Sequence, residues 1–300
     1  MIGKLKDLNT SSQFDFNLKK ALWYIIPIML LVILVSILGY NYYSLFTWQN
    51  VKSGINFNFV IFFFIGIFAQ LVDGTLGMGY GATSTSCLLA MGVPPAISST
   101  AVHVSEMFTT GASAIAHHKF GNINKKLTKS LIIPGVLGSI LGAYLLSDVI
   151  NGDAIKPFIA MYMICLATII IIKALRKNII KKKAKRLGIL ATFGGFMDAI
   201  GGGGWGPIVT STLLGSGRHA KYTIGSVNAA EFAVSFASGA TFLLFGGIVG
   251  WQIIIALILG GILAAPIAAI LVNKIKRKPM MIAVGILIII LSTKTLYKFL

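Results

Sequence analysis

The sequence predicts an all-α, polytopic membrane protein made of two inverted repeats, each with a glycine-broken re-entrant helical hairpin, and about seven full spans besides the two hairpins. Of 300 residues, 56% are hydrophobic and 11% are charged, with a mean hydropathy of +0.86. Such a chain is too apolar for a typical water-soluble domain. A span needs about 20 apolar residues, and runs almost free of charge cover residues 21–39, 130–147, 154–172, 250–272 and 280–293.

One unit occurs twice in the chain. A shift of 125 positions aligns residues 68–123 with residues 193–248 without a gap, and 17 of the 56 pairs are identical. The identical pairs include Asp73 with Asp198, Gly77 with Gly202, Gly79 with Gly204, Gly81 with Gly206, and Glu106 with Glu231. An internal repeat determines the architecture. It divides the chain into an N-terminal tail with an extra span (1–56), a first repeat (57–177), a basic cytoplasmic linker (178–186) and a second repeat (187–300).

The charged loops predict that the two repeats have opposite orientations. The formal net charge of +18 comes from Lys and Arg in short runs between apolar segments, and such runs mark the cytoplasmic side. The basic runs are residues 19–20, 119–129, 173–186 and 274–278, whereas residues 46–56, 148–156 and 245–251 are poor in charge. The first repeat is therefore entered from outside and the second from inside. Full spans are expected near 21–43, 97–118, 130–147, 154–175, 222–244, 250–273 and 280–297.

Glycine interrupts the chain at corresponding places, over residues 73–81 and 194–206. Each surrounding segment is too long for one span, so we expect re-entrant hairpins whose tips meet near the bilayer midplane. The tips read Asp-Gly-Thr-Leu-Gly-Met-Gly-Tyr-Gly from Asp73 and Asp-Ala-Ile-Gly-Gly-Gly-Gly-Trp-Gly from Asp198. Each precedes a short helix, whose first N–H groups lack partners and favour an anion. The alternative is that the glycines only permit close helix packing.

A polar stripe follows each hairpin. Its members step by three or four residues and so share a helix face: Ser99, His103, Glu106, Thr110, Ser113 and His117 in the first copy, and Asn228, Glu231, Ser235 and Ser238 in the second. A charge at the bilayer centre costs about 2.5 to 3.5 kcal/mol, so both stripes should face the protein interior. Asp73 and Asp198 either cap the following half-helix or couple transport to a proton or cation.

An anion at the tips must be held without a basic side chain, because no Lys or Arg occurs between Lys52 and Lys119 or between Lys221 and Lys274. His103 is expected to line the site rather than bind metal, since its counterpart is Asn228. Replacing Gly204 by Val is expected to block backbone approach at the tip, whereas replacing Gly142 by Ala, on a plain span, is expected to be mild by comparison. The predicted substrate-binding residues are Asp73, Gly77, Gly79, Tyr80, Gly81, Ser99, His103, Glu106, Asp198, Gly202, Gly203, Gly204, Trp205, Asn228 and Glu231.

With these motifs the sequence resembles the TauE/SafE sulfite exporter family of membrane permeases. The resemblance covers nearly all of residues 57–297, including the Gly-Val-Pro-Pro turn at 92–95 and the glycine run that ends at Pro207. It implies transport of sulfite, thiosulfate, sulfonates or related small organic anions across the cell membrane. The tips differ where Met78 and Tyr80 stand opposite Gly203 and Trp205, so an asymmetric site is expected.

Other functional classes fit the sequence less well. The basic residues do not follow one face, which argues against nucleic-acid binding. No HExxH, GxSxG or Ser/His/Asp pattern indicates an enzyme, and Cys87 and Cys165 have no metal-ligand spacing. The expected partners are a small anion, the lipid bilayer and a coupling proton or Na⁺, with no cofactor or metal. The main alternative is a cation-coupled carrier or channel that binds the cation with its buried acidic residues, Asp73, Glu106, Asp198 and Glu231.

Overall fold

The computed structural model describes residues 54–119, 121–176, 186–271 and 276–298. These residues form helices joined by turns, and no strand occurs among them. The elements are α3 (Phe57–Leu76), α4 (Tyr80–Ala90), α5 (Pro95–Lys119), α6 (Lys125–Tyr144), the π-helical turn η2 (Leu145–Val149), α7 (Gly152–Leu175), α8 (Leu187–Gly201), the π-helical turn η3 (Gly206–Thr210), α9 (Ser211–Gly215), α10 (Ala220–Phe245), α11 (Trp251–Leu271) and α12 (Arg277–Tyr297). The span expected near 21–43 lies outside the described residues.

Asparagine caps the starts of α3 and α6, as it also does for α7. The side-chain oxygen of Asn56 accepts a hydrogen bond from the backbone N–H of Phe59 at 3.2 Å, at the start of α3. Asn124 does the same for Leu127 at 3.1 Å, at the start of α6. Each contact satisfies an N–H group that has no intrahelical partner. The local sequence therefore sets where both helices begin.

Glycine ends the first helix of each repeat. α3 ends at Leu76, and Gly77 follows with a φ of 70°; α8 ends at Gly201, and Gly202 follows with a φ of 69°. Glycine is favoured at positive φ because it has no Cβ. A short helix follows in each repeat, α4 in the first and η3 with α9 in the second. The helix is thus broken at equivalent positions in both repeats, as the sequence predicted.

The second break is shorter than the predicted range of 194–206. α8 continues through Gly194 and Gly195, and a Cβ added to Gly195 would lie only 2.3 Å from the backbone oxygen of Gly135 in α6. Small residues let membrane helices approach this closely. The prediction was wrong for this pair because a glycine that admits another helix looks the same in a sequence as one that ends its own.

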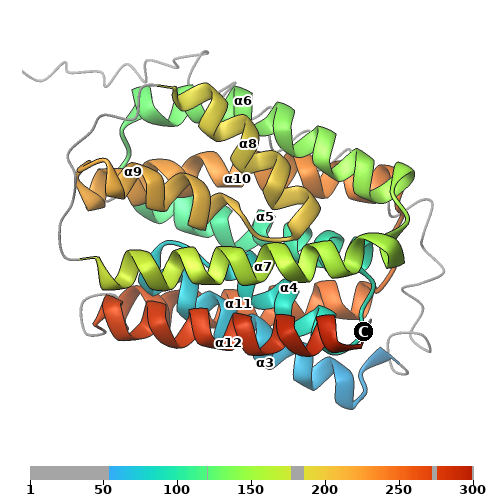
Figure 1. Ribbon diagram of the computed structural model, residues 1–300. Coiled ribbons are helices and arrows are strands. Elements are labelled where there is room, and N and C mark those ends of the chain that lie inside the picture. Colours follow the sequence, from blue (N-terminus) through green and yellow to red (C-terminus); the bar gives the residue numbers. More distant parts are fainter. Residues whose placement is uncertain (1–53, 120, 177–185, 272–275, 299–300) are drawn as a thin grey trace, which may run out of the picture. The chain divides into compact units, whose positions relative to one another are not determined.

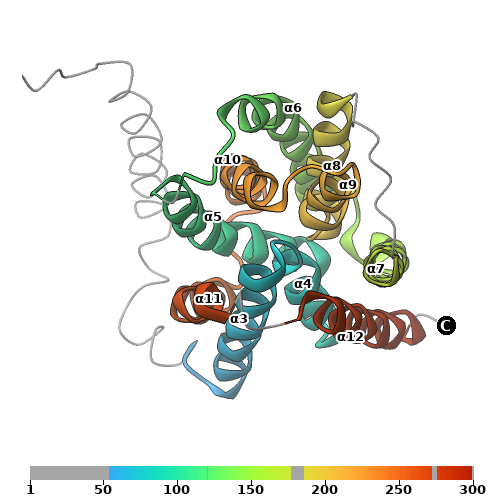
Figure 2. The same ribbon diagram turned by 90° about the vertical axis from the view of Figure 1, so that its left-hand side faces the viewer.

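The helices pack in reciprocal pairs. α3 packs along α11 and α8 packs along α6, while α5 pairs with α10 and α7 with α12 (Figure 2). Under the 125-residue shift α3 corresponds to α8 and α11 to α6, so the first two pairs are equivalent to each other. The last two pairs each join corresponding helices of the two repeats. This pattern is expected of two copies related by a two-fold axis, and it supports the inverted repeat, which stays a prediction.

The starts of α3, α5 and α11 lie together at one end of the described helices. A Cβ added to Gly54 would lie 2.7 Å from the ring of Trp251, and one added to Gly250 would lie 2.8 Å from Cγ2 of Ile97. Because α3 and α5 begin at the same end, α3 and α4 together run inward and return. α8 begins and α9 ends at the opposite end (Figure 1). The two hairpins therefore enter from different ends.

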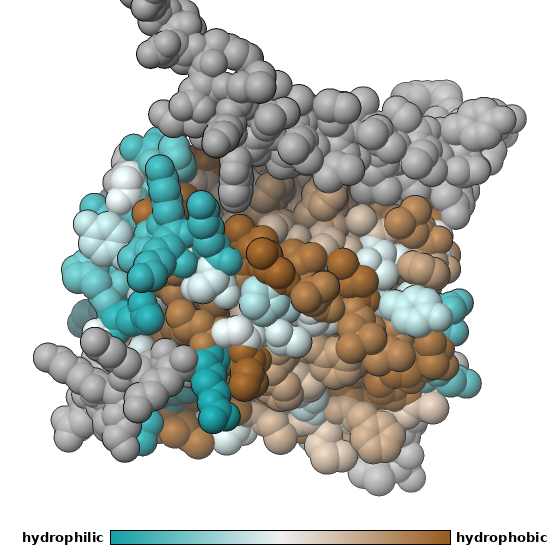
Figure 3. Space-filling view, turned by 90° about the horizontal axis from the view of Figure 1, so that it is seen from above, coloured by the Kyte–Doolittle hydropathy of each residue, from teal (hydrophilic) through white to brown (hydrophobic). Residues whose placement is uncertain are grey.

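Basic side chains flank the helix ends at that opposite end. α6 and α12 begin there and α7 ends there (Figure 1), and the backbone N–H of Asn124 donates to Ser226 Oγ at 2.8 Å, which joins the starts of α6 and α10. The flanking residues include Lys125, Arg176, Arg186, Arg218 and Lys276. Figure 3 shows hydrophilic residues gathered on one side of the face it presents and apolar residues over much of the rest. Such clustering is typical of a cytoplasmic membrane surface.

Five helical stretches in the described part are long and apolar enough to cross a bilayer: Phe57–Leu76, Lys125–Val149, Ala154–Leu175, Lys221–Phe245 and Lys278–Tyr297. α5 is not among them, because its polar stripe lowers its hydropathy, and the apolar part of α11 is the shorter Trp251–Ala265. α3 qualifies by length and composition, although the sequence assigned it to a hairpin. The helices fit a multi-pass membrane protein, and the number of full spans stays a prediction.

The interior combines apolar packing with buried polar side chains. Apolar residues such as Met163, Trp205 and Phe242 are fully enclosed. Acidic and other ionisable side chains are buried as well, namely Asp73, His103, Glu106, Asp198 and Glu231. A buried charge is costly unless it is paired or hydrogen-bonded. These residues therefore define the region where a functional site is to be sought.

Candidate substrate site

The two glycine tips touch through their backbones. A Cβ added to Gly203 would lie 2.1 Å from the backbone nitrogen of Ala82, and one added to Gly81 would lie 2.8 Å from the backbone oxygen of Gly202. A larger residue at either position would require the backbone to move. Thr85 Oγ1 also donates a hydrogen bond to the oxygen of Gly202 at 2.5 Å. The tips meet, as expected from the sequence, and in this conformation they are closed against each other.

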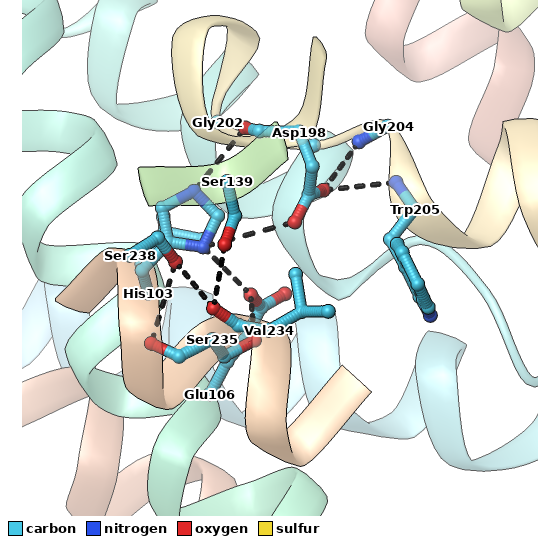
Figure 4. Close-up of polar contacts among 12 residues, drawn as sticks. His103, Glu106, Ser139, Asp198, Gly202, Gly204, Trp205, Val234, Ser235 and Ser238 are labelled. Carbon is cyan, nitrogen blue, oxygen red and sulfur yellow. Dashed lines mark hydrogen bonds and ion pairs between the residues drawn. The ribbon is translucent and has the colours of Figure 1, made fainter. Parts of the chain in front are cut away.

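The Asp198 side chain accepts hydrogen bonds from the first backbone N–H groups after the second break. Its Oδ1 accepts hydrogen bonds from the backbone N–H of Gly204 at 2.6 Å and of Trp205 at 2.9 Å (Figure 4). The carboxylate belongs to the last turn of α8 and caps the next helix across the break. Asp73 lies near the backbone N–H of Tyr80 at the first tip. The second tip thus already holds one carboxylate of the protein itself.

His103 lies between two acidic side chains (Figure 4). Its Nδ1 is 3.3 Å from Glu106 Oε2 and 3.8 Å from Asp198 Oδ2, and its Nε2 is 3.2 Å from the backbone oxygen of Asp198. The ring stacks on Phe242 with centroids 5.7 Å apart, and Ser235 donates to Glu106 Oε2 at 3.3 Å. All three ionisable residues are at most 2% exposed. The cluster joins α5 of the first repeat to α8 of the second.

Hydroxyl groups are concentrated in α4 and at the start of α5, the two helices that follow the first tip. Five of them are buried and have no hydrogen-bond partner in the protein: Thr83, Ser84 and Ser86 in α4, and Ser98 and Ser99 in α5. Ser99 is close to the second tip as well, since a Cβ added to Gly202 would lie 3.0 Å from its Oγ. Buried polar groups normally find partners, and each hydroxyl can donate one hydrogen bond. These groups are therefore available to a bound anion or to water.

The aromatic residues of the tips anchor them to the surrounding helices. The Tyr80 hydroxyl donates to Ser105 Oγ at 3.0 Å, and Trp205 Nε1 donates to the backbone oxygen of Val227 at 3.4 Å. Both side chains are buried. Their polar atoms are thus used within the protein, so positioning the tips is the role that the geometry supports for them.

The second polar stripe is arranged differently from the first. Asn228, the counterpart of His103, donates from Nδ2 to Ser113 Oγ at 3.0 Å. Glu231, the counterpart of Glu106, is buried as well. No Lys or Arg in the described part of the chain forms an ion pair with these four acids. The site is asymmetric and acidic in this conformation.

The comparisons with known proteins agree with this architecture. The family model described as sulfite exporter TauE/SafE matches residues 62–295. The chain belongs to the TauE/SafE family. It is 42% identical to the probable membrane transporter protein YtnM of Bacillus subtilis (strain 168) over 247 residues. The aligned region covers 79% of this chain and 82% of that protein. No solved structure matches significantly. The resemblance seen in the tips is confirmed, and the chain is a multi-pass protein of a membrane transporter family.

The predicted site residues of this TauE/SafE protein mostly surround the tips. Gly77 and Gly79 have positive φ, and the N–H of Gly77 donates to the oxygen of Asp73 at 2.6 Å. The N–H of Gly204 is taken by Asp198. The tip N–H groups expected to bind an anion are therefore partly used within the protein in this conformation, and Asn228 reaches Ser113 instead of the tips.

Two features of the site were missed in the sequence. The hydroxyl-rich run at residues 83–86 follows the first tip directly, so its position was a usable signal. Tyr162 of α7 gave no such signal, because it lies in an apolar span. Its hydroxyl nevertheless donates a hydrogen bond to the backbone oxygen of Gly203 at 3.4 Å. A contact between distant helices of this kind depends on the packing of α7 against the second tip, which no local pattern reveals.

Proposed function

We propose that this TauE/SafE family member carries a small anion, such as sulfite, thiosulfate or a sulfonate, across the membrane by alternating access. The observation that carries the proposal is the hydrogen bonding of Asp198 Oδ1 to the N–H groups of Gly204 and Trp205. Two N–H groups at the start of a helix already donate to a carboxylate oxygen there, which supports the proposal that this tip can hold negative charge. The substrate class follows from the family description.

Binding would use N–H groups and hydroxyls instead of basic side chains. An incoming anion would take the N–H groups that Asp198 holds in the closed conformation. The unpartnered hydroxyl of Ser99 lies beside the second tip and supplies a further donor. Oxyanions such as sulfite accept several hydrogen bonds at once, so this donor set matches them chemically.

Alternating access would separate the tips from one side at a time. The first hairpin enters from the end where α3 and α5 begin, and the second enters from the opposite end (Figure 1). Their contact through Gly81 and Gly203 closes the path between the two ends. Movement of one repeat against the other would open the tips toward one compartment and then toward the other.

A cation-coupled carrier is the second candidate. It is favoured by the four buried acids, Asp73, Glu106, Asp198 and Glu231, none of which pairs with a Lys or Arg among the described residues. Intramembrane carboxylates usually mark a proton or ion path. In this alternative a cation gradient drives transport and the acids bind the cation directly.

The direct test is a binding screen with the purified full-length protein. Its thermal midpoint would be measured with sulfite, thiosulfate, methanesulfonate and chloride, all as salts of the same cation. A ligand at 100 times its Kd stabilises the folded state by about 2.7 kcal/mol, so sulfur oxyanions should raise the midpoint and chloride should not. Ser99→Ala should shift the response to higher concentrations, with Ser130→Ala as a control outside the tips. No stabilisation by any sulfur oxyanion would contradict the proposal.

A further inference from the structure

The ring of His103 is held in one tautomer by the backbone. Its Nε2 is 3.2 Å from the carbonyl oxygen of Asp198, and a carbonyl oxygen can only accept a hydrogen bond. Nε2 therefore carries a hydrogen, and Nδ1 of the neutral ring presents a lone pair. That lone pair faces Glu106 Oε2 at 3.3 Å and Asp198 Oδ2 at 3.8 Å. Three electron-rich atoms are thus directed at one another.

Hydrogen bonds to neighbouring groups also fix the carboxylates of Asp198 and Glu106. Asp198 uses Oδ1 for two backbone N–H groups, which leaves its buried Oδ2 without a hydrogen-bond partner. Ser235 donates to Oε2 of Glu106. Hydrogen bonds that orient an imidazole and its neighbouring carboxylates in this way are typical of the surroundings of a metal ion. The unpartnered Oδ2 and the Nδ1 lone pair are both directed into the cluster.

We propose that His103 Nδ1, Glu106 and Asp198 bind one divalent first-row metal ion, such as Zn²⁺ or Mn²⁺. The three ligand atoms lie within 4.8 Å of one another. Two ligands that are each about 2.1 Å from the same ion are about 3 to 4 Å apart, which agrees with the two distances from Nδ1. Mixed imidazole and carboxylate donors suit Zn²⁺ and Mn²⁺.

The charge of the cluster favours a divalent ion. Two carboxylates would balance two positive charges, and no Lys or Arg in the described residues pairs with them. A shared proton is the competing occupant, but a charge-assisted N–H···O bond would be about 2.7 to 2.9 Å long, shorter than the distances found here. The second repeat has Asn228 in place of His103, and this side chain bonds to Ser113. The metal site therefore belongs to one repeat, where the sequence alone had suggested none.

The test of this proposal would measure metal binding without any transported anion, so its result would not depend on the proposed function. Purified full-length protein would be stripped with EDTA, incubated with Zn²⁺ or Mn²⁺ and desalted. Bound metal per chain would then be determined by mass spectrometry and the thermal midpoint recorded. We expect about one ion per chain and a higher midpoint. Glu106→Gln and His103→Gln should weaken binding at least ten-fold, as loss of a ligand requires. Asp148→Asn, an exposed carboxylate outside the cluster, should bind metal like the wild type.

A second readout guards against variants that fold poorly. Co²⁺ bound to the wild type should give visible absorption bands that change or disappear in His103→Gln, with both proteins eluting alike in size-exclusion chromatography. The proposal is overturned if the stripped wild type takes up neither Zn²⁺ nor Mn²⁺. It is also overturned if both ligand variants bind metal as the wild type does, or if the midpoint responds to pH alone, which would assign the cluster to a proton.

Discussion

Gly81 and Gly203 lie against each other through their backbones, so that a Cβ added to Gly81 would be 2.9 Å from Cα of Gly203. Each glycine belongs to a different repeat, and their contact is where the two hairpin tips meet. Close contact of this kind leaves no space between the two backbones for a ligand. It makes the described conformation a closed one, from which the tips must separate before an anion can bind between them.

Gly203→Ala should destabilise the closed tips. The new methyl group would lie 2.1 Å from the backbone nitrogen of Ala82, and no rotamer change can relieve a clash with the backbone. Overpacking typically costs about 1 to 3 kcal/mol, so the thermal midpoint should fall and transport should decrease. Gly215→Ala is the matched control, because a Cβ there meets nothing within 4 Å. Equal midpoints for the two variants would argue against the tip contact.

Asp198→Ala should cost more stability than Asp198→Asn. Alanine leaves the N–H groups of Gly204 and Trp205 buried without their acceptor, at about 1 to 3 kcal/mol for each, whereas asparagine keeps an acceptor oxygen. Thermal unfolding of the purified variants measures the difference. If both variants unfold at the wild-type temperature, Asp198 does not cap the half-helix and its hydrogen bonds are not needed for the fold.

Glu106→Gln and Glu231→Gln should reduce transport by different amounts. Glu106 contacts His103 and Ser235, whereas the position one turn before Glu231 is Asn228, which bonds to Ser113. Glu106→Gln removes the negative charge next to His103 and leaves Ser235 a neutral acceptor, to which hydrogen bonds are weaker than to a carboxylate, so it should lower the rate more than Glu231→Gln. Initial rates in proteoliposomes from pH 5 to 8 test this. If both variants transport at the wild-type rate across this pH range, the two glutamates have a structural role and do not take part in transport.

Cysteines placed at the two ends of the helices should be labelled from opposite sides of the membrane. The background would lack Cys87 and Cys165, since Cys165 is exposed. Lys125→Cys lies at the basic end and should react from the cytoplasmic side, and Val249→Cys should react from outside. Lys182→Cys, beyond the described residues, should behave like Lys125→Cys. Labelling of both ends from one side would contradict the inverted repeat.

The sequence predicted much of the framework because periodic and repeated features are local. The breaks at Gly77 and Gly202 follow from glycine clusters, and the buried polar face of α5 follows from the spacing of Ser99, His103 and Glu106. The contacts between repeats could not be predicted in this way. That Asp198 turns toward His103 and also caps Gly204 depends on how α8 packs against α5.

Gly142 shows the limit of reading glycines from a sequence. It stands on an apparently plain span, and Ala was expected to be mild there. The structure places the backbone of α8 against it, so that a Cβ would lie 2.6 Å from the backbone oxygen of Phe196. Gly142 is therefore not at a plain position, because the packing of α6 on α8 distinguishes it from Gly215, where a Cβ meets nothing within 4 Å. How its substitution compares with Gly204→Val stays a prediction.

The most direct test of the central claim is sulfite flux into proteoliposomes that contain the purified protein. Radiolabelled sulfite or thiosulfate would be supplied on one side, with Na⁺, K⁺ or choline as the only cation in parallel experiments. We expect saturable uptake that follows the anion gradient and is the same with all three cations, while empty liposomes take up none. If no sulfur oxyanion enters, or if radiolabelled Na⁺ flux continues without any of these anions, the protein is not a small-anion carrier.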